Sequence, residues 1–131
     1  MKTVKGTFNV KLTPAETPYT GDGINKLGRL TIDKQFSGAL EAKSKGEMLS
    51  AMTQKEGSAG YVAIENVEGM LDGKIGSFVL QHYGKMNSGS SHLTLEIVPD
   101  SGTNELKGLS GSMKIINEGG NHEYELTYEM V

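Results

Sequence analysis

The chain of 131 residues suits a single domain, residues 1–131, and carries a formal charge of −3 without a dense cluster of Lys and Arg, which argues against a nucleic-acid partner. It contains no cysteine, so disulfides, thiolate metal sites and thiol nucleophiles are excluded and a reducing compartment is expected. No stretch approaches the ~20 apolar residues of a membrane helix and no apolar signal core is present, so we expect a cytoplasmic protein with no membrane partner.

The alternation of apolar and polar residues predicts an all-β chain, because period two recurs far more clearly than helical spacing. The first predicted strand, Thr3 to Leu12, places Phe8, Val10 and Leu12 on one face. The segment from Thr13 to Lys26 follows with two prolines and two glycines. This composition predicts the longest irregular connection of the chain, a flap over one end of the fold.

The second and third predicted strands carry polar residues on the face that we expect to point inward. In the strand from Gly28 to Phe36, Lys34 shares a face with apolar residues, so its ammonium group needs a partner or solvent. In the strand from Leu40 to Met52, alternating Glu and Lys residues form one face, and small residues that include Ser44 form the other. The charged face is therefore expected on the outside.

The stretch from Gly60 to His82 predicts a β-hairpin, because Asp72-Gly73 favours a two-residue turn that determines the pairing of the two strands. Counting back from this turn makes Glu65 and His82 diagonal neighbours on an otherwise apolar inward face. The pairs expected on that face are Leu71 with Lys74, Gly69 with Gly76, Val67 with Phe78, Glu65 with Leu80, Ala63 with His82, and Tyr61 with Gly84.

The remaining third of the chain predicts three further strands. His92 to Pro99 alternates and ends at its proline. Residues 101–107 contain helix-capping residues and predict a single short helical turn. Gly111 to Asn117 then leads through a glycine-rich turn into a sharply amphipathic strand from His122 to Met130.

The eight predicted strands favour a single antiparallel up-and-down barrel, because closure removes the exposed edges of an open sheet. A sandwich of two sheets is the alternative. Small residues on the inward faces, such as Ala42, Ser44 and Ala63, would leave room for one small ligand inside a barrel of ~8 strands.

Several runs of the sequence resemble a bacterial family of unknown function over nearly the whole chain. That family is similar in structure to allene oxide cyclase, so the resemblance implies an eight-stranded barrel with an internal cavity. It implies no activity, since the family has no established catalytic residues. The runs that carry the resemblance are Phe36-Ser37-Gly38, Gly60-Tyr61-Val62-Ala63, Gly76-Ser77-Phe78-Val79-Leu80-Gln81-His82 and Val98-Pro99-Asp100-Ser101-Gly102-Thr103.

Glu65 and His82 are the candidate catalytic residues, because a carboxylate that orients an imidazole can move a proton on a bound molecule. A buried polar pair that serves only stability is the interpretation favoured over this dyad. The candidate ligand contacts are Ser44, Tyr61, Phe78 and Tyr124, all inward by parity. For Tyr61, packing over the glycine gap at Gly84 is favoured over a ligand contact.

No metal and no cofactor are expected. The three histidines, His82, His92 and His122, lack close ligand spacing, and His92 has outward parity.

The leading functional hypothesis is a barrel that binds a small, largely apolar molecule. One alternative is a cofactor-independent isomerase or cyclase in which Glu65 and His82 transfer protons, and another is an assembly protein whose barrel is filled by its own side chains. Val62, Ile64 and Met70 form a second apolar surface on the outside, which predicts a homo-oligomer.

Overall fold

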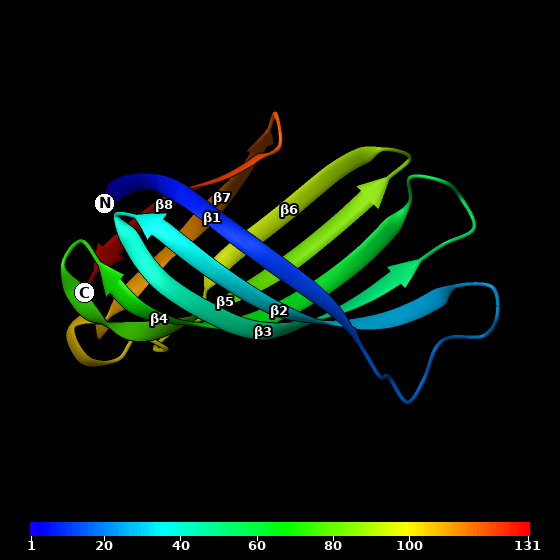
Figure 1. The fold of residues 1–131 in the computed structure, drawn as a ribbon, viewed down its shortest axis with the longest axis horizontal. Helices are drawn as coiled ribbons and strands as arrows, with labels where there is room; N and C mark the ends of the chain where they lie inside the picture. Colours follow the sequence, from blue (N-terminus) through cyan, green and yellow to red (C-terminus); the bar gives the residue numbers. More distant parts are fainter.

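The computed structural model describes the backbone of residues 1–131 and every side chain except that of Glu118. The strands form one closed antiparallel barrel in chain order, β1-β2-β3-β4-β5-β6-β7-β8, as predicted (Figure 1). Closure of the ladder excludes the alternative of two separate sheets. The elements are β1 Lys2–Ala15, β2 Lys26–Gly38, β3 Leu40–Met52, β4 Ala59–Leu71, β5 Lys74–Asn87, β6 Ser90–Ile97, the 3₁₀ turn η1 Asn104–Leu106, β7 Leu109–Glu118 and β8 Asn121–Met130.

Most predicted strands are confirmed, but β1 and β2 are longer than expected. β1 continues through Pro14, which pairs with Leu30, to Ala15, which pairs with Arg29. Proline is tolerated here because β8 pairs only with residues 2–7 of β1, so the other edge of β1 needs no ladder donor at Pro14. The irregular connection therefore shortens to residues 16–25.

The register predicted for the β4–β5 hairpin is confirmed at every inward pair, from Leu71 with Lys74 to Tyr61 with Gly84. Asp72 and Gly73 have φ angles of 50° and 82°. Positive φ at both central positions is what a two-residue hairpin turn with the right twist requires. The local turn chemistry therefore determines which β4 and β5 side chains share the interior.

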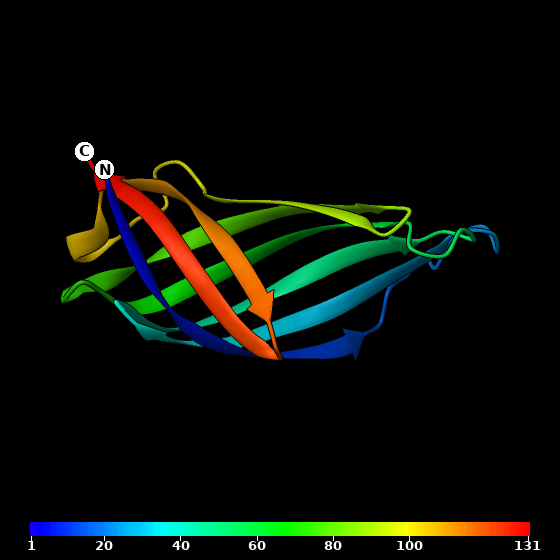
Figure 2. The same ribbon diagram turned by 90° about the horizontal axis from the view of Figure 1, so that it is seen from above.

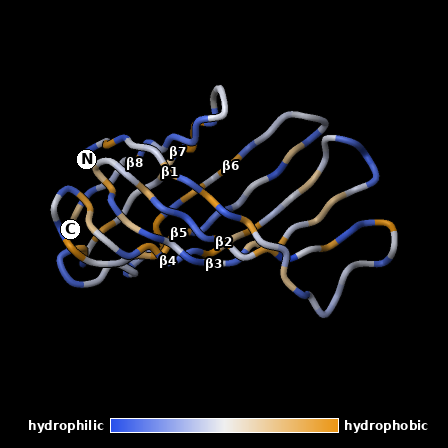
Figure 3. The backbone as a smooth tube through the Cα atoms, viewed as in Figure 1, coloured by the Kyte–Doolittle hydropathy of each residue, from blue (hydrophilic) through white to orange (hydrophobic). Residues whose placement is uncertain are grey.

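The end of the barrel that holds both chain termini is a closed apolar core. Polar and apolar residues alternate along the strands (Figure 3), so each strand contributes its apolar side chains to the interior. Tyr124 anchors this end, since its hydroxyl accepts the N–H of Leu40 at 2.9 Å and lies 3.1 Å from the carbonyl oxygen of Ser37. The largest fully buried apolar side chains are Tyr124, Phe36, Phe78, Leu40, Leu71, Leu80, Leu95, Leu106, Leu109, Leu126 and Val67.

The opposite end of the barrel is open, because β7 and β8 stop short of it (Figure 2). β6 pairs with β7 only through Glu96 and Ser112, and beyond this point a hollow of about 580 Å³ separates the two strands. The strands β1 to β6 therefore extend past the β7–β8 hairpin as a curved sheet, which we call the trough. Closure removes exposed edges only in the half that holds the termini.

Among the described residues, no helical segment combines the length and the apolar character needed to cross a membrane.

The single β6–β7 pair predicts uneven protection of backbone amides. We expect the amides of residues 90–95 in β6 that point toward β7 to exchange at least about tenfold faster than those of residues 63–67 in β4, because exposed strand edges open at low cost. Hydrogen exchange followed by NMR measures this difference. Equal protection of the two segments would contradict the open edge.

Candidate functional site

Four polar side chains are buried where the closed core meets the trough. Lys34 of β2, Ser44 of β3, Glu65 of β4 and His82 of β5 expose 7%, 1%, 0% and 5% of their surfaces. They come from four neighbouring strands and share inward parity with the core. We call these four residues the polar floor. Buried polar groups are costly unless they are paired, so their gathering needs an energetic explanation.

Glu65 is the centre of the polar floor. Its Oε2 atom lies 3.0 Å from the Nζ atom of Lys34 and 3.2 Å from the Nε2 atom of His82. Its Oε1 atom accepts a hydrogen bond of 3.3 Å from Lys34. The contacts at Oε2 lie within ion-pair distance but lack hydrogen-bond direction, so among the described residues Oε2, His82 Nε2 and Ser44 Oγ are buried without a directional partner.

The surrounding residues make the buried ammonium group tolerable. The Nζ atom of Lys34 lies 5.2 Å from the ring centroid of Phe8 and 5.7 Å from that of Phe36, within the range of cation–π attraction. Gly46 pairs with Glu65, and a Cβ atom there would collide with the backbone and Cβ of Glu65. Glycine at this position therefore lets β3 approach the backbone of β4 at Glu65.

Glu65 is ionised at neutral pH. Burial raises its pKa, but the contacts with His82 and Lys34 together outweigh burial, and the net effect lowers the pKa below the ordinary 4.5. An unprotonated imidazole nitrogen 3.2 Å from a carboxylate oxygen would be repelled by it, so we assign the ring proton of His82 to Nε2. The polar floor thus holds a carboxylate between an ammonium group and an imidazole N–H.

Tyr61 lies above the polar floor on the trough side. Its ring centroid is 6.3 Å from that of His82, and the ring covers Gly84, where an added Cβ atom would collide with it. Packing over glycine is therefore the observed arrangement. Burial, and then the charge of Glu65, raise the pKa of the Tyr61 hydroxyl, so the side chain stays a neutral phenol.

The structure brings together only part of the predicted site. Ser44, Glu65 and His82 meet in the polar floor with Tyr61 beside them. Phe78 and Tyr124 instead belong to the closed core, each 1% exposed, and the Tyr124 hydroxyl is used by backbone groups. These two residues therefore lie away from the trough, although their parity is inward as expected.

Lys34 is the site residue that sequence reasoning missed. The signal was present, because a lysine on the apolar face of the second predicted strand requires a partner. What the sequence did not show was that the partner is Glu65, which lies 31 residues away in the chain and two strands away in the barrel.

The walls of the trough are mainly apolar. Leu12, Met86 and Leu93 share the inward parity of the polar floor and remain 45%, 42% and 41% exposed. Leu30 and Met48, which pair with each other, are half-buried between these walls and the polar floor. An apolar surface thus leads inward to a small buried set of charged and hydrogen-bonding atoms.

A second apolar surface lies on the outside of the barrel, as predicted for Val62 and Ile64. Leu49, Val62 and Tyr83 pair across β3, β4 and β5 and are 54%, 49% and 55% exposed. Ile64 is 51% exposed beside them. These four residues form what we call the outer patch, and part of it lines a shallow hollow of about 440 Å³.

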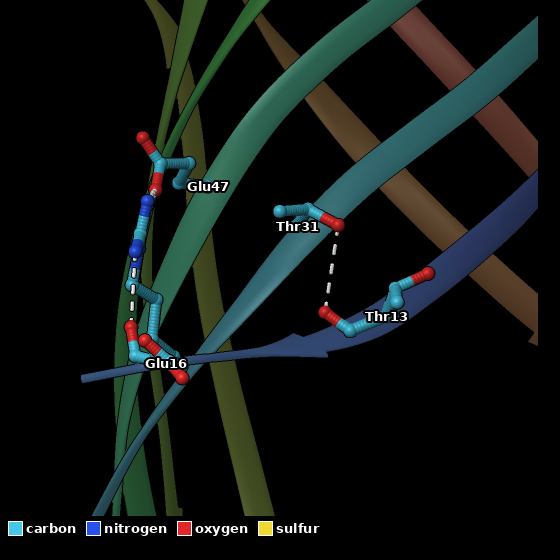
Figure 4. A network of polar contacts seen from close by, with 5 residues as sticks. Thr13, Glu16, Thr31 and Glu47 are labelled. Carbon is cyan, nitrogen blue, oxygen red and sulfur yellow. Dashed lines mark hydrogen bonds and ion pairs between the residues drawn. The ribbon is translucent and has the colours of Figure 1, made fainter.

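Polar contacts tie the strands together at the border of the outer patch (Figure 4). Arg29 of β2 forms an ion pair with Glu47 of β3 and donates a hydrogen bond of 3.0 Å to the carbonyl oxygen of Glu16. The Thr31 hydroxyl donates to the carbonyl oxygen of Thr13 at 3.4 Å. These contacts hold the start of the 16–25 connection against β2 and β3 next to the patch.

Within the described part of the chain, no group of three or more His, Asp or Glu residues could hold a metal ion.

Comparisons with known proteins identify relatives without an assigned activity. A family model described as "Protein of unknown function (DUF3224)" matches residues 4–128. A crystal structure of a DUF3224-family protein of unknown function from Shewanella oneidensis MR-1 is 56% identical, with a TM-score of 0.97, and the match covers 100% of this chain and 98% of that chain. No protein with a curated description matches the sequence.

Glu65→Gln tests the energetics of the polar floor. It leaves the charge of Lys34 buried without its counter-ion, so we expect the free energy of unfolding at pH 7 to fall by about 3 kcal/mol. Because folding lowers the pKa of Glu65, its ionised form stabilises the fold above the ordinary pKa of 4.5, and this contribution is lost as the pH falls below that value. Urea denaturation from pH 7 to pH 3 should therefore show the difference from wild type shrinking in acid.

The control is Glu68→Gln on the same strand, whose side chain is exposed. It should change stability by less than about 0.5 kcal/mol at either pH. A similar loss in both variants, or a Glu65→Gln difference that stays constant from pH 7 to pH 3, would show that the Lys34–Glu65 contact does not stabilise the fold.

Proposed function

We propose that this chain, which belongs to the DUF3224 family of proteins of unknown function, binds a small, largely apolar molecule in the trough of its barrel. The observation that carries the proposal is the polar floor at the inner end of an apolar trough. Ligand sites combine mostly apolar walls with a few convergent polar groups that orient the ligand, and this combination is what the two features provide.

The division of the barrel supports binding in the trough rather than in the closed core. The core around Phe36, Phe78 and Tyr124 is filled by its own side chains. In the trough, Leu12, Met86 and Leu93 keep more than a third of their surfaces exposed. Covering such surface with an apolar ligand contributes about 0.8 kcal/mol for each buried CH₂ group.

A second candidate function is a cofactor-independent isomerase or cyclase. The observation that favours it is the contact between the Glu65 carboxylate and the Nε2 atom of His82 at 3.2 Å, in a site from which water is largely excluded. In this reaction class Glu65 would take a proton from the bound molecule and His82 would orient the carboxylate. Turnover that is lost in Glu65→Gln while binding persists would distinguish the enzyme from a binding protein.

We also propose that a second copy of the chain covers the outer patch. Leu49, Val62 and Tyr83 form a continuous apolar row on the outer face of neighbouring strands. Glu47 and Lys85 lie at diagonally opposite corners of this row, since they pair with Ile64 and Gly60 on either side of Val62. A two-fold axis through the row would place each of these charges near its opposite on the other copy.

Met48→Lys tests ligand binding in the trough. The substitution places a charge in the apolar wall, so we expect it to weaken the binding of the neutral apolar dye Nile red at least about tenfold. Fluorescence titration measures the affinity, and circular dichroism checks that the barrel remains folded. Native mass spectrometry of the purified wild type should also show a retained small molecule.

Ile116→Lys is the matched control, since Ile116 lies on the outer face of β7, away from both the trough and the outer patch. It should leave dye binding unchanged. If wild type does not bind the dye, or if the two variants lose binding equally, the trough is not the binding site.

Val62→Lys tests self-association through the outer patch. At a protein concentration of tens of micromolar, we expect light scattering to give wild type a mass that is a multiple of the 14.0 kDa chain. The variant should have the mass of a single chain, because a buried unpaired lysine opposes association. Ile116→Lys lies on the outer face of β7, away from the outer patch, and should give the same mass in light scattering as wild type. A wild type that is strictly monomeric at this concentration would contradict the proposal.

A further inference from the structure

We propose that the molecule held in the trough ends in an uncharged oxygen group, a hydroxyl or a carbonyl, and not in a carboxylate or an amine. This inference rests on the proposed binding function and names the chemical class of the ligand. The argument uses the charges in the polar floor, the atoms that surround them, and the hydrogen-bonding groups that they leave available.

The charges of the polar floor already balance each other. The ammonium group of Lys34 and the carboxylate of Glu65 are 3.0 Å apart, and both side chains are at least nine-tenths buried. The Nε2 atom of His82 lies 3.2 Å from the same carboxylate. A second buried charge would therefore enter a site with no unpaired counter-ion for it.

The residues around the polar floor offer no further compensation. The inward neighbours on the adjoining strands are apolar, and they comprise Phe8, Val10, Ile32, Ala63, Leu80 and Leu95. A ligand carboxylate near Ser44 would face Glu65 at short range, and a ligand ammonium group would face Lys34. In a site of low dielectric such repulsion is weakly screened, so both charged classes are disfavoured.

The available hydrogen-bonding atoms match a neutral oxygen. Ser44 Oγ and Glu65 Oε2 are buried without a directional partner among the described residues. The Ser44 hydroxyl and the remaining N–H groups of Lys34 can donate to a ligand oxygen, while the Glu65 carboxylate can only accept. A hydroxyl both accepts and donates, and a carbonyl accepts, so either satisfies part of this set without adding charge.

The test compares three molecules with the same ten-carbon chain. They are 1-decanol, decanoate and decylamine, each used to displace Nile red from wild type at pH 7. We expect 1-decanol to displace the dye at a concentration at least about tenfold lower than either charged molecule. Only a charged end group would lose a strong hydration shell on entering the site, where no unpaired opposite charge compensates for the loss. Displacement that is strongest with decanoate or decylamine, or equal for all three, would overturn the inference and leave the binding proposal standing.

Charge-changing variants test the reason for the preference. Glu65→Gln leaves Lys34 without a counter-ion, so the preference should move toward decanoate, and Lys34→Met should move it toward decylamine. Glu68→Gln, with its charge outside the barrel, should keep the wild-type order. Unchanged preferences in folded Glu65→Gln and Lys34→Met would also overturn the inference.

Ser44→Ala provides a test that changes no charge, in case the charge variants do not fold. It should weaken displacement by 1-decanol several-fold and leave decanoate and decylamine nearly unaffected, since it removes a donor to the neutral oxygen. An equal effect on all three molecules would contradict a hydrogen bond from Ser44. Failure of Nile red to bind wild type would instead refute the binding function itself.

Discussion

The difference in strand length around the barrel determines the rest of the structure. β1 to β5 contain 13 or 14 residues each, whereas β7 and β8 contain 10. Backbone groups can pair around the whole ring only where all strands are present, so the barrel closes at the end that holds the termini. The excess length of β1 to β5 continues as the trough, and the 8-residue β6 reaches into it because it pairs with the far half of β5. One molecule therefore contains both a filled apolar core and an exposed concave surface.

The polar floor occupies the boundary between these two environments. Deeper in the core, a carboxylate would be surrounded by Leu71, Phe78 and Leu126 and would have no counter-ion. Farther along the trough, solvent would screen the attraction between Lys34 and Glu65. At the boundary the pair is dry enough for a strong interaction, and it lies next to the trough in which we propose that a ligand binds. Replacing a buried pair of this kind by well-packed apolar residues is often neutral or stabilising, so net stability alone does not explain its presence.

Part of this site could be predicted from the sequence. The diagonal proximity of Glu65 and His82 follows from the Asp72-Gly73 turn and strict alternation, both of which act over neighbouring residues. The contact of Lys34 with Glu65 could not be derived in the same way, since it depends on the registers of β2 with β3 and of β3 with β4 together. Phe78 and Tyr124 face inward as alternation predicts, but their depth could not be predicted, because alternation indicates direction and not position along the barrel axis.

The sequence alone therefore determined the all-β class, the register of the β4–β5 hairpin and the inward or outward direction of most side chains, and it favoured an up-and-down barrel over a sandwich. These properties arise from local backbone geometry, in which the side-chain period of two and the turn types leave few alternatives. Only the tertiary structure decided where closure stops, which residues fill the core and which line the trough. Those outcomes depend on the stagger of eight strands around a ring, and each ladder transmits that stagger to the next.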